Sequence, residues 1–183
     1  LLDGAADAPE ERQQAARTIH DEANRMARLV NELLDLARLE SGQLQIAKRS
    51  VDLSEIMADV YRSMLPQARA REIDLHLDTP APLTVMGDPD RLIQIFTNLA
   101  NNALAHTPTG GTVKLVTRAV DGWIEGIVTD TGPGLPAEEL PRIFERFYRL
   151  EKSRARGEDG RGAGLGLAIV NELVTAHGGH VQV

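Results

Sequence analysis

Residues 88–106 read DPDRLIQIFTNLANNALAH, and this stretch decides how the rest of the sequence is interpreted. Asp88 followed by Pro89 is typical of the start of a helix, because the carboxylate can accept hydrogen bonds from free amides and proline needs no amide donor there. The apolar side of the predicted helix consists of Leu92, Phe96, Leu99 and Ala103. We therefore expect a helix from Asp88 to about His106 that packs on one side.

Two asparagines interrupt the other side of this helix. Asn98 and Asn102 are four residues apart and so lie one turn above each other, with His106 one turn further. Asparagine is unfavourable inside a helix, so a stacked pair requires an explanation. Amide oxygens are suitable ligands for magnesium, which itself binds nucleotide phosphates. A solvated helix face is the alternative explanation for these residues alone.

A second motif is Asp130-Thr131-Gly132-Pro133-Gly134, which follows a run rich in β-branched residues. A carboxylate at the end of a strand can accept a hydrogen bond from an exocyclic amine, and glycines allow the backbone to approach a flat ring. These properties suit adenine. An ordinary turn remains the alternative, because Asp and Gly are common turn residues.

A third motif is the glycine-rich segment 160–167, GRGAGLGL, which leads into an amphipathic helix. Such a junction offers free backbone amides and the positive end of a helix dipole to an anionic phosphate. The segment is neither a Walker motif, which needs Gly-Lys-Ser/Thr, nor a dinucleotide fingerprint, which would follow a strand. A flexible hinge is the alternative interpretation.

Outward from these motifs, the sequence predicts an α+β fold. We expect a helix from about 52 to 70, a strand at 73–77, and a hairpin of strands 112–120 and 123–130 joined by Asp121-Gly122. A helical stretch is expected between the loop at 131–136 and Tyr148, then a polar mobile lid at 150–161. A last helix to about Ala176 and a strand at 180–183 follow. The irregular order of elements favours a two-layer sandwich, a mostly antiparallel sheet with helices on one face.

The first part of the chain has a different pattern. From Asp7 to about Glu40, apolar residues such as Ile19, Met26 and Leu33 repeat every seven positions and form a wide stripe that suits a helical bundle. Asp3-Gly4 resembles the turn of a helical hairpin, so we expect the first arm to precede this sequence. The domains expected are 1–46, a partial dimerisation domain, and 47–183.

Composition narrows the function classes. The 183 residues carry a formal net charge of −7, which argues against general binding to nucleic acid or anionic lipid. The absence of cysteine excludes disulfides and thiolate chemistry. No apolar run reaches the ~18 residues of a membrane-spanning helix. We therefore expect a soluble piece with no membrane contact of its own.

The order and spacing of the motifs resemble a known family. Asn-x-x-x-Asn-Ala at 98–103, the Asp130 motif, Ile-Phe-Glu-Arg-Phe-Tyr-Arg at 143–149, and Gly-x-Gly-Leu-Gly-Leu at 162–167 closely resemble, in that order, four boxes of bacterial sensor histidine kinases. Residues 26–38, MARLVNELLDLAR, resemble the second dimerisation helix of the same family. The resemblance covers essentially the whole chain and implies the ATP-binding fold of the GHKL type, with ATP and Mg²⁺ as cofactors.

The resemblance also implies roles for individual residues. Asn102 would bind magnesium, Asn98 would act beside the phosphates, and both would be catalytic. Asp130 would bind the adenine amine between Gly132 and Gly134, and Arg149 would reach a phosphate. Phe144 and Phe147 are expected to anchor the lid. The backbone around the phosphates would come from Gly162, Ala163, Gly164, Leu165 and Gly166.

The chain departs from the family pattern at two places. Ala105 and His106 stand where many members have a basic residue and a tyrosine, so one charge near the phosphates is absent and the ring contact is altered. The His-Glu phospho-acceptor motif is not found, and His20 lies in the wrong context to replace it. We therefore expect an enzyme that does not phosphorylate itself.

Related ATPases of the same fold resemble this chain but differ at one position. Gyrase-type topoisomerases, Hsp90-type chaperones and MutL-type proteins carry a water-activating glutamate where this chain has Asn98, and an amide cannot take up a proton at neutral pH. The expected function is therefore transfer of the ATP γ-phosphate to a histidine, for relay to an aspartate of a response regulator. We also expect a homodimer and a parent protein anchored in the membrane, with this part in the cytoplasm. A degenerate nucleotide-binding or dimerisation module without phosphotransfer is the alternative.

Overall fold

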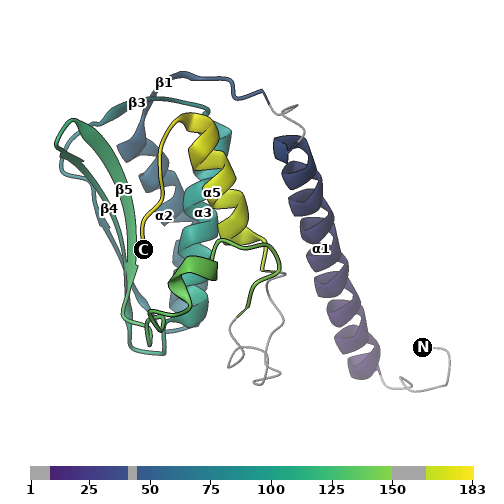
Figure 1. Ribbon diagram of the computed structural model, residues 1–183. Helices are drawn as coiled ribbons and strands as arrows, with labels where there is room; N and C mark the ends of the chain where they lie inside the picture. The colour runs from purple at the N-terminus through teal and green to yellow at the C-terminus, as the bar shows by residue number, and fades with distance from the viewer. Residues whose placement is uncertain (1–8, 41–44, 150–163) are drawn as a thin grey trace.

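The computed structural model describes residues 9–40, 45–149 and 164–183, and it consists of a long helix beside an α+β sandwich (Figure 1). The long helix α1 spans Pro9–Glu40. The remaining elements in chain order are β1 (Arg49–Asp52), α2 (Leu53–Ala70), β2 (Asp74–Asp78), β3 (Thr84–Gly87), α3 (Pro89–His106), β4 (Thr112–Val120), β5 (Trp123–Asp130), the 3-10 turn η1 (Leu140–Arg142) and α5 (Gly166–His177).

The main sheet has the order β2-β4-β5 and is mixed. Strand β2 runs parallel to β4, which requires a crossover, and α3 lies within that crossover. Strands β4 and β5 are antiparallel and form the expected hairpin. Asp121 and Gly122 form the turn of that hairpin, with φ values of 50° and 82°. Both positive φ values match a type I′ turn, which follows the twist of the strands.

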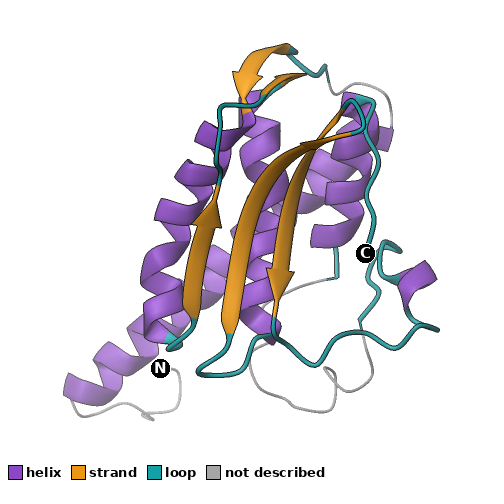
Figure 2. Cartoon of the chain, turned by 90° about the vertical axis from the view of Figure 1, so that its left-hand side faces the viewer, coloured by secondary structure: helices purple, strands orange, loops and turns teal. Residues whose placement is uncertain are grey.

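Helices α2, α3 and α5 cover one face of this sheet, as Figure 2 shows with the strands in front and the helices behind. The layer between them is the hydrophobic core. Its fully buried side chains include Met57 and Val60 of α2, Leu115 of β4 and Ile169 of α5. The two-layer sandwich predicted from the sequence is therefore confirmed, with helices on one face.

Capping residues explain where two of these helices begin. Asp52 precedes α2 and its Oδ1 accepts a hydrogen bond from the amide of Ser54 at 2.9 Å. Asp88 precedes α3, and its Oδ1 accepts from the amides of Asp90 and Arg91 at 3.1 and 3.3 Å. Both carboxylates accept hydrogen bonds from backbone amides that have no partner within the helix.

Three expectations about secondary structure were incomplete or wrong. The short strands β1 and β3, which pair antiparallel away from the main sheet, were not predicted. The helical stretch expected up to Tyr148 is only the 3-10 turn at 140–142. Pro141 lacks the amide that a continuing helix needs, and Phe147 takes a left-handed φ of 61°, which ends helical geometry.

The strand expected at 180–183 is also absent, because these residues pair with no strand in the described structure. Instead the ring of His180 meets Trp123 of β5 edge-on at a centroid distance of 5.2 Å. This segment therefore meets β5 through a side-chain contact and not through ladder hydrogen bonds. The lid expected at 150–161 lies outside the described residues.

Candidate functional site

Helix α3 carries the two asparagines on the side that does not enter the core. Its opposite side is buried: Leu92, Ile95, Phe96, Ala100 and Ala103. Asn102 and His106 are exposed, whereas Asn98 is half-buried. The helical spacing predicted from the sequence therefore separates a packing side from an open polar side.

The Asp130 motif lies against the C-terminal end of α3. Asp130 ends β5, and its Oδ1 accepts a hydrogen bond from the amide of Gly132 at 2.7 Å. A Cβ added at Gly132 would stand 2.6 Å from this oxygen and 2.9 Å from the carbonyl oxygen of His106. The backbone of the motif thus touches the last turn of α3, and only glycine allows so close an approach. Gly134, with φ 68°, takes a left-handed conformation at an open position.

The other glycine-rich turn lies against the middle of α3. Asn98 Nδ2 donates to the carbonyl oxygen of Gly166, the first residue of α5, at 3.5 Å. Leu165 is buried in the core and so fixes the start of that helix. Gly162 and Ala163, which were expected to line the phosphates, lie outside the described residues.

Gly164 connects this turn to the segment with three aromatic residues at 144–148. Its φ is 73°, and a Cβ there would stand 2.6 Å from the carbonyl oxygen of Tyr148. The amide of Phe147 donates to the carbonyl oxygen of Gly164 at 3.0 Å. The aromatic segment is therefore held to the start of α5 by its backbone, and this close contact is a reason for glycine that the sequence alone did not reveal.

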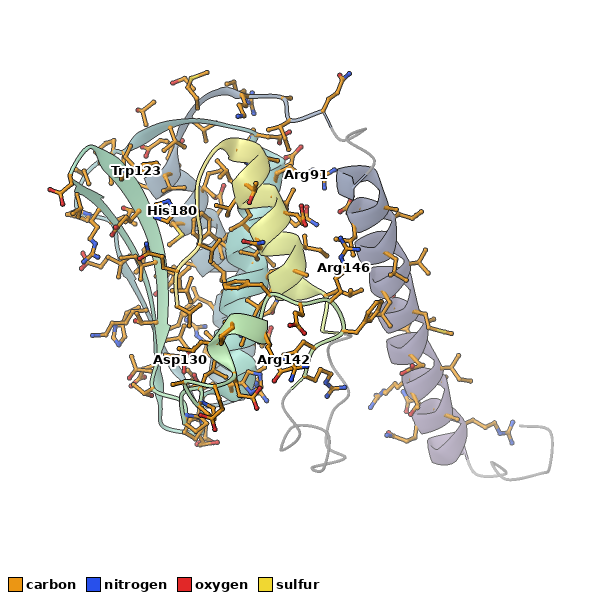
Figure 3. The ribbon with its side chains drawn as sticks, in the orientation of Figure 1. Arg91, Trp123, Asp130, Arg142, Arg146 and His180 are labelled. Atoms are coloured by element: carbon orange, nitrogen blue, oxygen red, sulfur yellow. The ribbon has the colours of Figure 1, made fainter. Side chains whose placement is uncertain are left out.

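The aromatic side chains of this segment differ in exposure, and the lid that Phe144 and Phe147 were expected to anchor lies outside the described residues. Phe147 is 58% exposed and Phe144 is half-buried, so Phe147 does not anchor the segment in the core. Arg142 instead lies over the ring of Tyr148, 4.4 Å from its centroid. Arg149 follows directly and is half-buried. Figure 3 shows Asp130 and Arg142 near the same end of the domain.

Together these contacts place both glycine-containing turns against one helix. Asn98 touches the start of α5, and the end of α3 at His106 touches the Asp130 turn. Asn102 lies between them along α3, and no other described residue holds its amide by a hydrogen bond. The structure therefore brings an exposed asparagine side chain, a carboxylate at a strand end and a helix N-terminus to the same side of α3.

The donor set fits a nucleotide-bound magnesium ion. Among the described residues, no three His, Cys, Asp or Glu side chains converge on a point that could hold a metal ion. A divalent cation here would depend on amide oxygen and on phosphates brought by a ligand. Magnesium accepts such ligands, since it usually retains waters and binds through few protein groups and substrate phosphates.

The N-terminal end of α3 is anchored by Asp88. Burial raises the pKa of its carboxyl, but hydrogen bonds from the amides of Ala47, Arg91 and Asp90 and the charge of Arg91 outweigh this and hold the pKa below its ordinary value. The ring of His177 in α5 accepts a hydrogen bond from the Asp88 amide at 3.0 Å through Nε2. The start of α3 is thus fixed to the end of α5.

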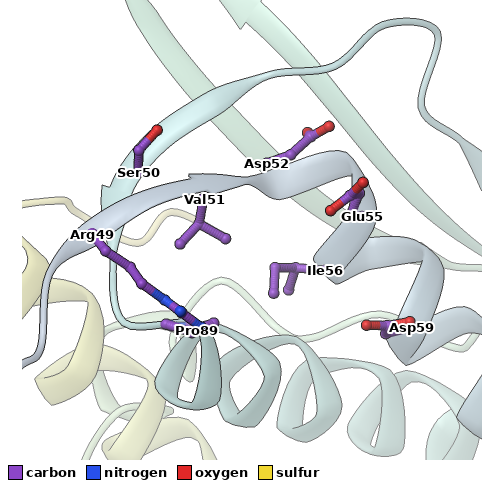
Figure 4. Close-up of a pocket in the computed structure, with 8 residues that line it drawn as sticks. All are labelled: Arg49, Ser50, Val51, Asp52, Glu55, Ile56, Asp59 and Pro89. Carbon is purple, nitrogen blue, oxygen red and sulfur yellow. The ribbon is translucent and has the colours of Figure 1, made fainter.

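A cavity of about 260 Å³ lies away from these residues, between the β1 strand and the start of α2 (Figure 4). Its lining residues are Arg49, Ser50, Val51, Asp52, Glu55, Ile56, Asp59 and Pro89. It contains none of the predicted site residues. The carboxylate of Asp52 is already engaged by the amides of Ser54 and Leu83. The cavity therefore gives no support to a nucleotide site.

Two family models match this chain. The family model described as histidine kinase-, DNA gyrase B-, and HSP90-like ATPase matches residues 87–183. The model described as His Kinase A (phospho-acceptor) domain matches residues 1–42. The first match contains the predicted site residues, and the second contains α1.

Similar proteins include sensor kinases from several bacteria. The chain is 35% identical over 179 residues to the sensor-like histidine kinase SenX3 of Mycobacterium tuberculosis, covering 98% of this chain and 43% of SenX3. It is 38% identical over 163 residues to the sensor histidine kinase CusS of Escherichia coli, covering 89% of this chain and 33% of CusS. The chain thus spans less than half the length of these curated relatives.

Two solved structures also align with this chain. Full-length ShkA in complex with AMPPNP aligns with a TM-score of 0.78 at 34% identity, covering 93% of this chain and 35% of that one. The mycobacterial sensor histidine kinase MprB aligns with a TM-score of 0.60 at 34% identity, covering 72% and 81%.

Proposed function

Because the chain belongs to the family of histidine kinase-, DNA gyrase B- and HSP90-like ATPases, and is the ATP-binding catalytic core of a sensor histidine kinase, we propose that it binds Mg-ATP along the polar side of α3 and transfers the γ-phosphate to a histidine. The observation that carries this proposal is the position of α3 between the Asp130 turn and the start of α5. A nucleotide lying along α3 would have its base at one turn and its phosphates at the other.

The individual roles follow from chemistry and position. Asp130 accepts a hydrogen bond from the adenine amine, with Gly132 and Gly134 beside the ring and His106 at its edge. Asn102 contributes an amide oxygen to magnesium, which neutralises charge on the phosphates. Asn98 lies beside the phosphates. The backbone amides of Gly162, Ala163, Gly164, Leu165 and Gly166, with the guanidinium of Arg149, bind phosphate oxygens.

Asn98 also decides between transfer and hydrolysis. A glutamate at this position could accept a proton from water, whereas an amide cannot. The carboxamide is also oriented by its contact with the Gly166 carbonyl. Water is therefore poorly activated, and ATP is retained for a protein nucleophile, where positioning and charge stabilisation provide most of the catalysis.

We further propose that residues 1–46 form part of a dimerisation and phosphotransfer domain and residues 47–183 the catalytic domain. In this assignment the acceptor histidine is not in the chain. His20 is exposed on α1, where Asn24 Nδ2 lies 3.0 Å from its Nε2. The phosphoryl group would then pass to an aspartate of a response regulator, within a homodimer formed through α1.

No helix among the described residues is long and apolar enough to span a membrane. We propose that this part of the protein is cytoplasmic and that the parent is anchored in the membrane. The relatives' greater length leaves room for such an anchor outside the matched region.

Calorimetric titration with ATP and magnesium tests the nucleotide site. Asn102→Ala should weaken Mg-ATP binding by roughly tenfold or more, because a ligand to the metal is removed. Asn101→Ala is the matched control, since Asn101 is the neighbouring exposed asparagine of the same helix and should leave binding unchanged. Equal losses in both variants, or binding that does not depend on magnesium, would contradict the assignment of Asn102.

Incubation with γ-labelled ATP tests the transfer. We expect label on a separately supplied acceptor domain but not on this chain. Strong labelling of His20 would refute the proposal that the acceptor is elsewhere. Ala105 motivates the second candidate function, a degenerate module, because it replaces a charged residue near the phosphates. ATP binding without transfer to a competent acceptor would favour that candidate.

A further inference from the structure

The C-terminal end of α3 is held by a side chain from another part of the fold. The last carbonyl groups of a helix have no amide partner within it and need donors from elsewhere. The carbonyl oxygen of Ala103 accepts from the amide and from Oγ1 of Thr107, at 2.9 and 2.7 Å. The carbonyl oxygen of Leu104 accepts from Nη1 of Arg71, the residue that follows α2. A guanidinium thus lies at the negative end of the α3 dipole.

The charge of Arg71 is directed at this helix end. Arg71 is half-buried, and within the described part of the chain it forms no ion pair with a carboxylate. Its positive charge therefore faces the partial negative charge of the α3 carbonyl groups. A hydrogen bond from a charged donor is also stronger than one between neutral groups. Arg71 is thus well suited to fix the position of the last turn of α3.

The backbone of the α2–β2 connection, residues 71–74, holds the loop that follows α3. Glu72 takes a left-handed φ of 54°, and its carbonyl oxygen accepts from the amide of Gly110 at 2.9 Å. The amide of Asp74 donates to the carbonyl oxygen of Gly111 at 2.9 Å. The α2–β2 connection therefore binds both the end of α3 and the loop after it.

The chain from His106 to Thr112 also contacts the turn that carries Asp130. The amide of Thr112 donates to Thr131 Oγ1 at 2.9 Å, and the amide of Thr131 donates to the carbonyl oxygen of Thr112 at 3.0 Å. A Cβ added at Gly132 would stand 2.9 Å from the carbonyl oxygen of His106. The end of α3 thus lies between the α2–β2 connection and the Asp130 turn.

The phosphate end of the proposed site is held separately. Asn98, about two turns before the end of α3, donates to the carbonyl oxygen of Gly166. Leu165 fixes the same turn by its burial in the core. Asp130 lies at the opposite end of the domain from Arg91, which is in the first turn of α3 (Figure 3). A small displacement of the last turn of α3 would therefore move the Asp130 turn and leave the start of α5 in place.

Base recognition is the part of binding that is most sensitive to such a displacement. Asp130 Oδ1 accepts from the amide of Gly132, which orients the carboxylate relative to its turn. A hydrogen bond to an exocyclic amine weakens steeply when its distance or angle departs from the ordinary range. The phosphate contacts lie elsewhere and do not depend on this carboxylate. A loosened turn would therefore reduce discrimination between bases before it reduced phosphate binding.

We propose that Arg71 is a positioning residue for base recognition, because it holds the C-terminal end of α3 and, through it, the carboxylate of Asp130. The effect on nucleotide selection rests on the proposed function, whereas the hold of Arg71 on the Asp130 turn does not. Removing the guanidinium should weaken selection for a base with an exocyclic amine and spare the phosphate contacts.

Calorimetric titration with the magnesium complexes of ATP and inosine triphosphate (ITP) tests the selection. ITP has a carbonyl group where ATP has its amine, so the ratio of the two affinities reports the bond to Asp130. Arg71→Gln should lower that ratio by roughly fivefold, through loss of ATP affinity with ITP affinity unchanged. Arg69→Gln removes an exposed arginine from the last turn of α2, so it is the matched control and should keep the ratio. Equal losses for both nucleotides, or a wild-type ratio in Arg71→Gln, would overturn the proposal.

Two further variants separate positioning from a general loss of structure. Arg71→Lys should keep the ATP preference within about twofold of wild type, because one hydrogen bond to a carbonyl does not need the planar guanidinium. A lysine variant as unselective as the glutamine variant would contradict the role of the charged donor.

Gly110→Ala loosens the same loop and serves even if Arg71→Gln does not fold. Gly110 has a φ of 78° and open space around its Cα, so the substitution strains only the backbone. This variant should also lose ATP affinity while it keeps ITP affinity. Equal weakening of both nucleotides would again count against the proposal.

Steady-state transfer to a supplied acceptor domain gives an independent readout. Arg71→Gln should raise KM for ATP roughly fivefold and leave kcat within about twofold, because the lost interaction is made equally in the bound state and the transition state. A fall in kcat at unchanged KM would overturn the assignment to base binding.

Amide hydrogen exchange tests the hold on the Asp130 turn without nucleotide. In Arg71→Gln, the amides of Thr112, Thr131 and Gly132 should exchange roughly fivefold faster or more, because the turn opens more often. The amide of Ile169, which donates to Leu165 at the start of α5, should keep its rate. A uniform increase across the domain, or none at the turn, would overturn the proposal. A wild-type chain that binds neither nucleotide, or both equally, would instead refute the proposed base contact, and the exchange rates would still decide whether Arg71 holds the turn.

Discussion

Helices α1 and α3 are both amphipathic, yet they treat their apolar sides differently. In α3 the apolar residues Leu92 and Phe96 are 8% and 6% exposed, because they pack on the sheet. In α1 Leu36, near the end of the helix, is 4% exposed and packs in the domain core, whereas Met26 and Leu33 are 62% and 45% exposed. An apolar repeat therefore shows that a helix needs a partner, but not whether that partner lies within the same chain.

The largest expected effect is on the packed side of α3. Phe96→Ala should lower the free energy of unfolding by about 3–5 kcal/mol, because it removes a large buried side chain and leaves a cavity against β5. Met26→Ala on α1 is the matched control and should change it by less than about 0.5 kcal/mol. Denaturant unfolding of both variants measures the difference. Similar losses would mean that the two apolar sides are equally buried.

A second prediction concerns the same contact between α3 and β5, but the substitution is made in the sheet. A Cβ added at Gly126 of β5 would stand 2.3 Å from the ring of Phe96, so Gly126→Ala should lower the free energy of unfolding by about 1–3 kcal/mol. Adding Phe96→Leu to this variant gives the methyl group more room. The double variant should therefore lose less stability than the sum of the two single changes. Strict additivity in denaturant unfolding would contradict the contact.

Much of α3 and of the elements around it could be predicted from the sequence. Asp88-Pro89 marked the start of α3, the apolar spacing gave its buried side, and Asp121-Gly122 gave the hairpin. These signals are local, since capping, helical periodicity and turn geometry depend on neighbouring residues. The separation of Asn98 and Asn102 from the apolar side followed from the same periodicity.

The remainder depended on contacts between distant segments. Strands β1 and β3 have four residues each and few apolar side chains, so no local pattern distinguishes them from loops. Pro141 and the left-handed Phe147 prevented a helix where the composition suggested one. Glycine is unfavourable within a strand, and the ring of Phe96, 2.3 Å from a Cβ added at Gly126, explains why β5 has glycine there. The contact of Arg71 with the Leu104 carbonyl joins residues 33 apart and left no sequence signal.

A smaller effect is expected where α3 begins. Asp88→Asn should cost about 1 kcal/mol at pH 7, because the amide accepts fewer backbone hydrogen bonds and loses the attraction of Arg91. Asp90→Asn, in the same helical turn, should cost less, since the carboxylate of Asp90 caps no amide. Thermal unfolding of the three proteins at pH 7 measures both changes.

The pH dependence of this effect has a defined sign. The folded pKa of Asp88 lies below its ordinary value of 3.8, so its charge stabilises the fold fully above that value. This contribution is lost as the pH falls through the lowered folded pKa. The stability difference between wild type and Asp88→Asn should therefore shrink below about pH 4. A difference that grows on acidification would contradict the assigned direction.

The smallest effect on stability is expected on the open side of α1, where the change should appear in association instead. Replacing Ile19, Met26 and Leu33 together by Gln should alter the unfolding free energy of the catalytic domain by less than about 0.5 kcal/mol, because these side chains are exposed and outside its core. The same change should weaken dimerisation by roughly tenfold or more, as apolar area is no longer available to a second helix.

Sedimentation of the triple variant across a range of concentrations measures this association. Asn31→Gln, an exposed change outside the seven-residue repeat, is the control and should leave the dimer intact. Dimerisation that survives the triple change would place the interface elsewhere. A large loss of stability in the monomer would instead show that α1 covers the domain with its apolar stripe. In that case the contrast between α1 and α3 would fail, because both helices would bury their apolar sides within one chain.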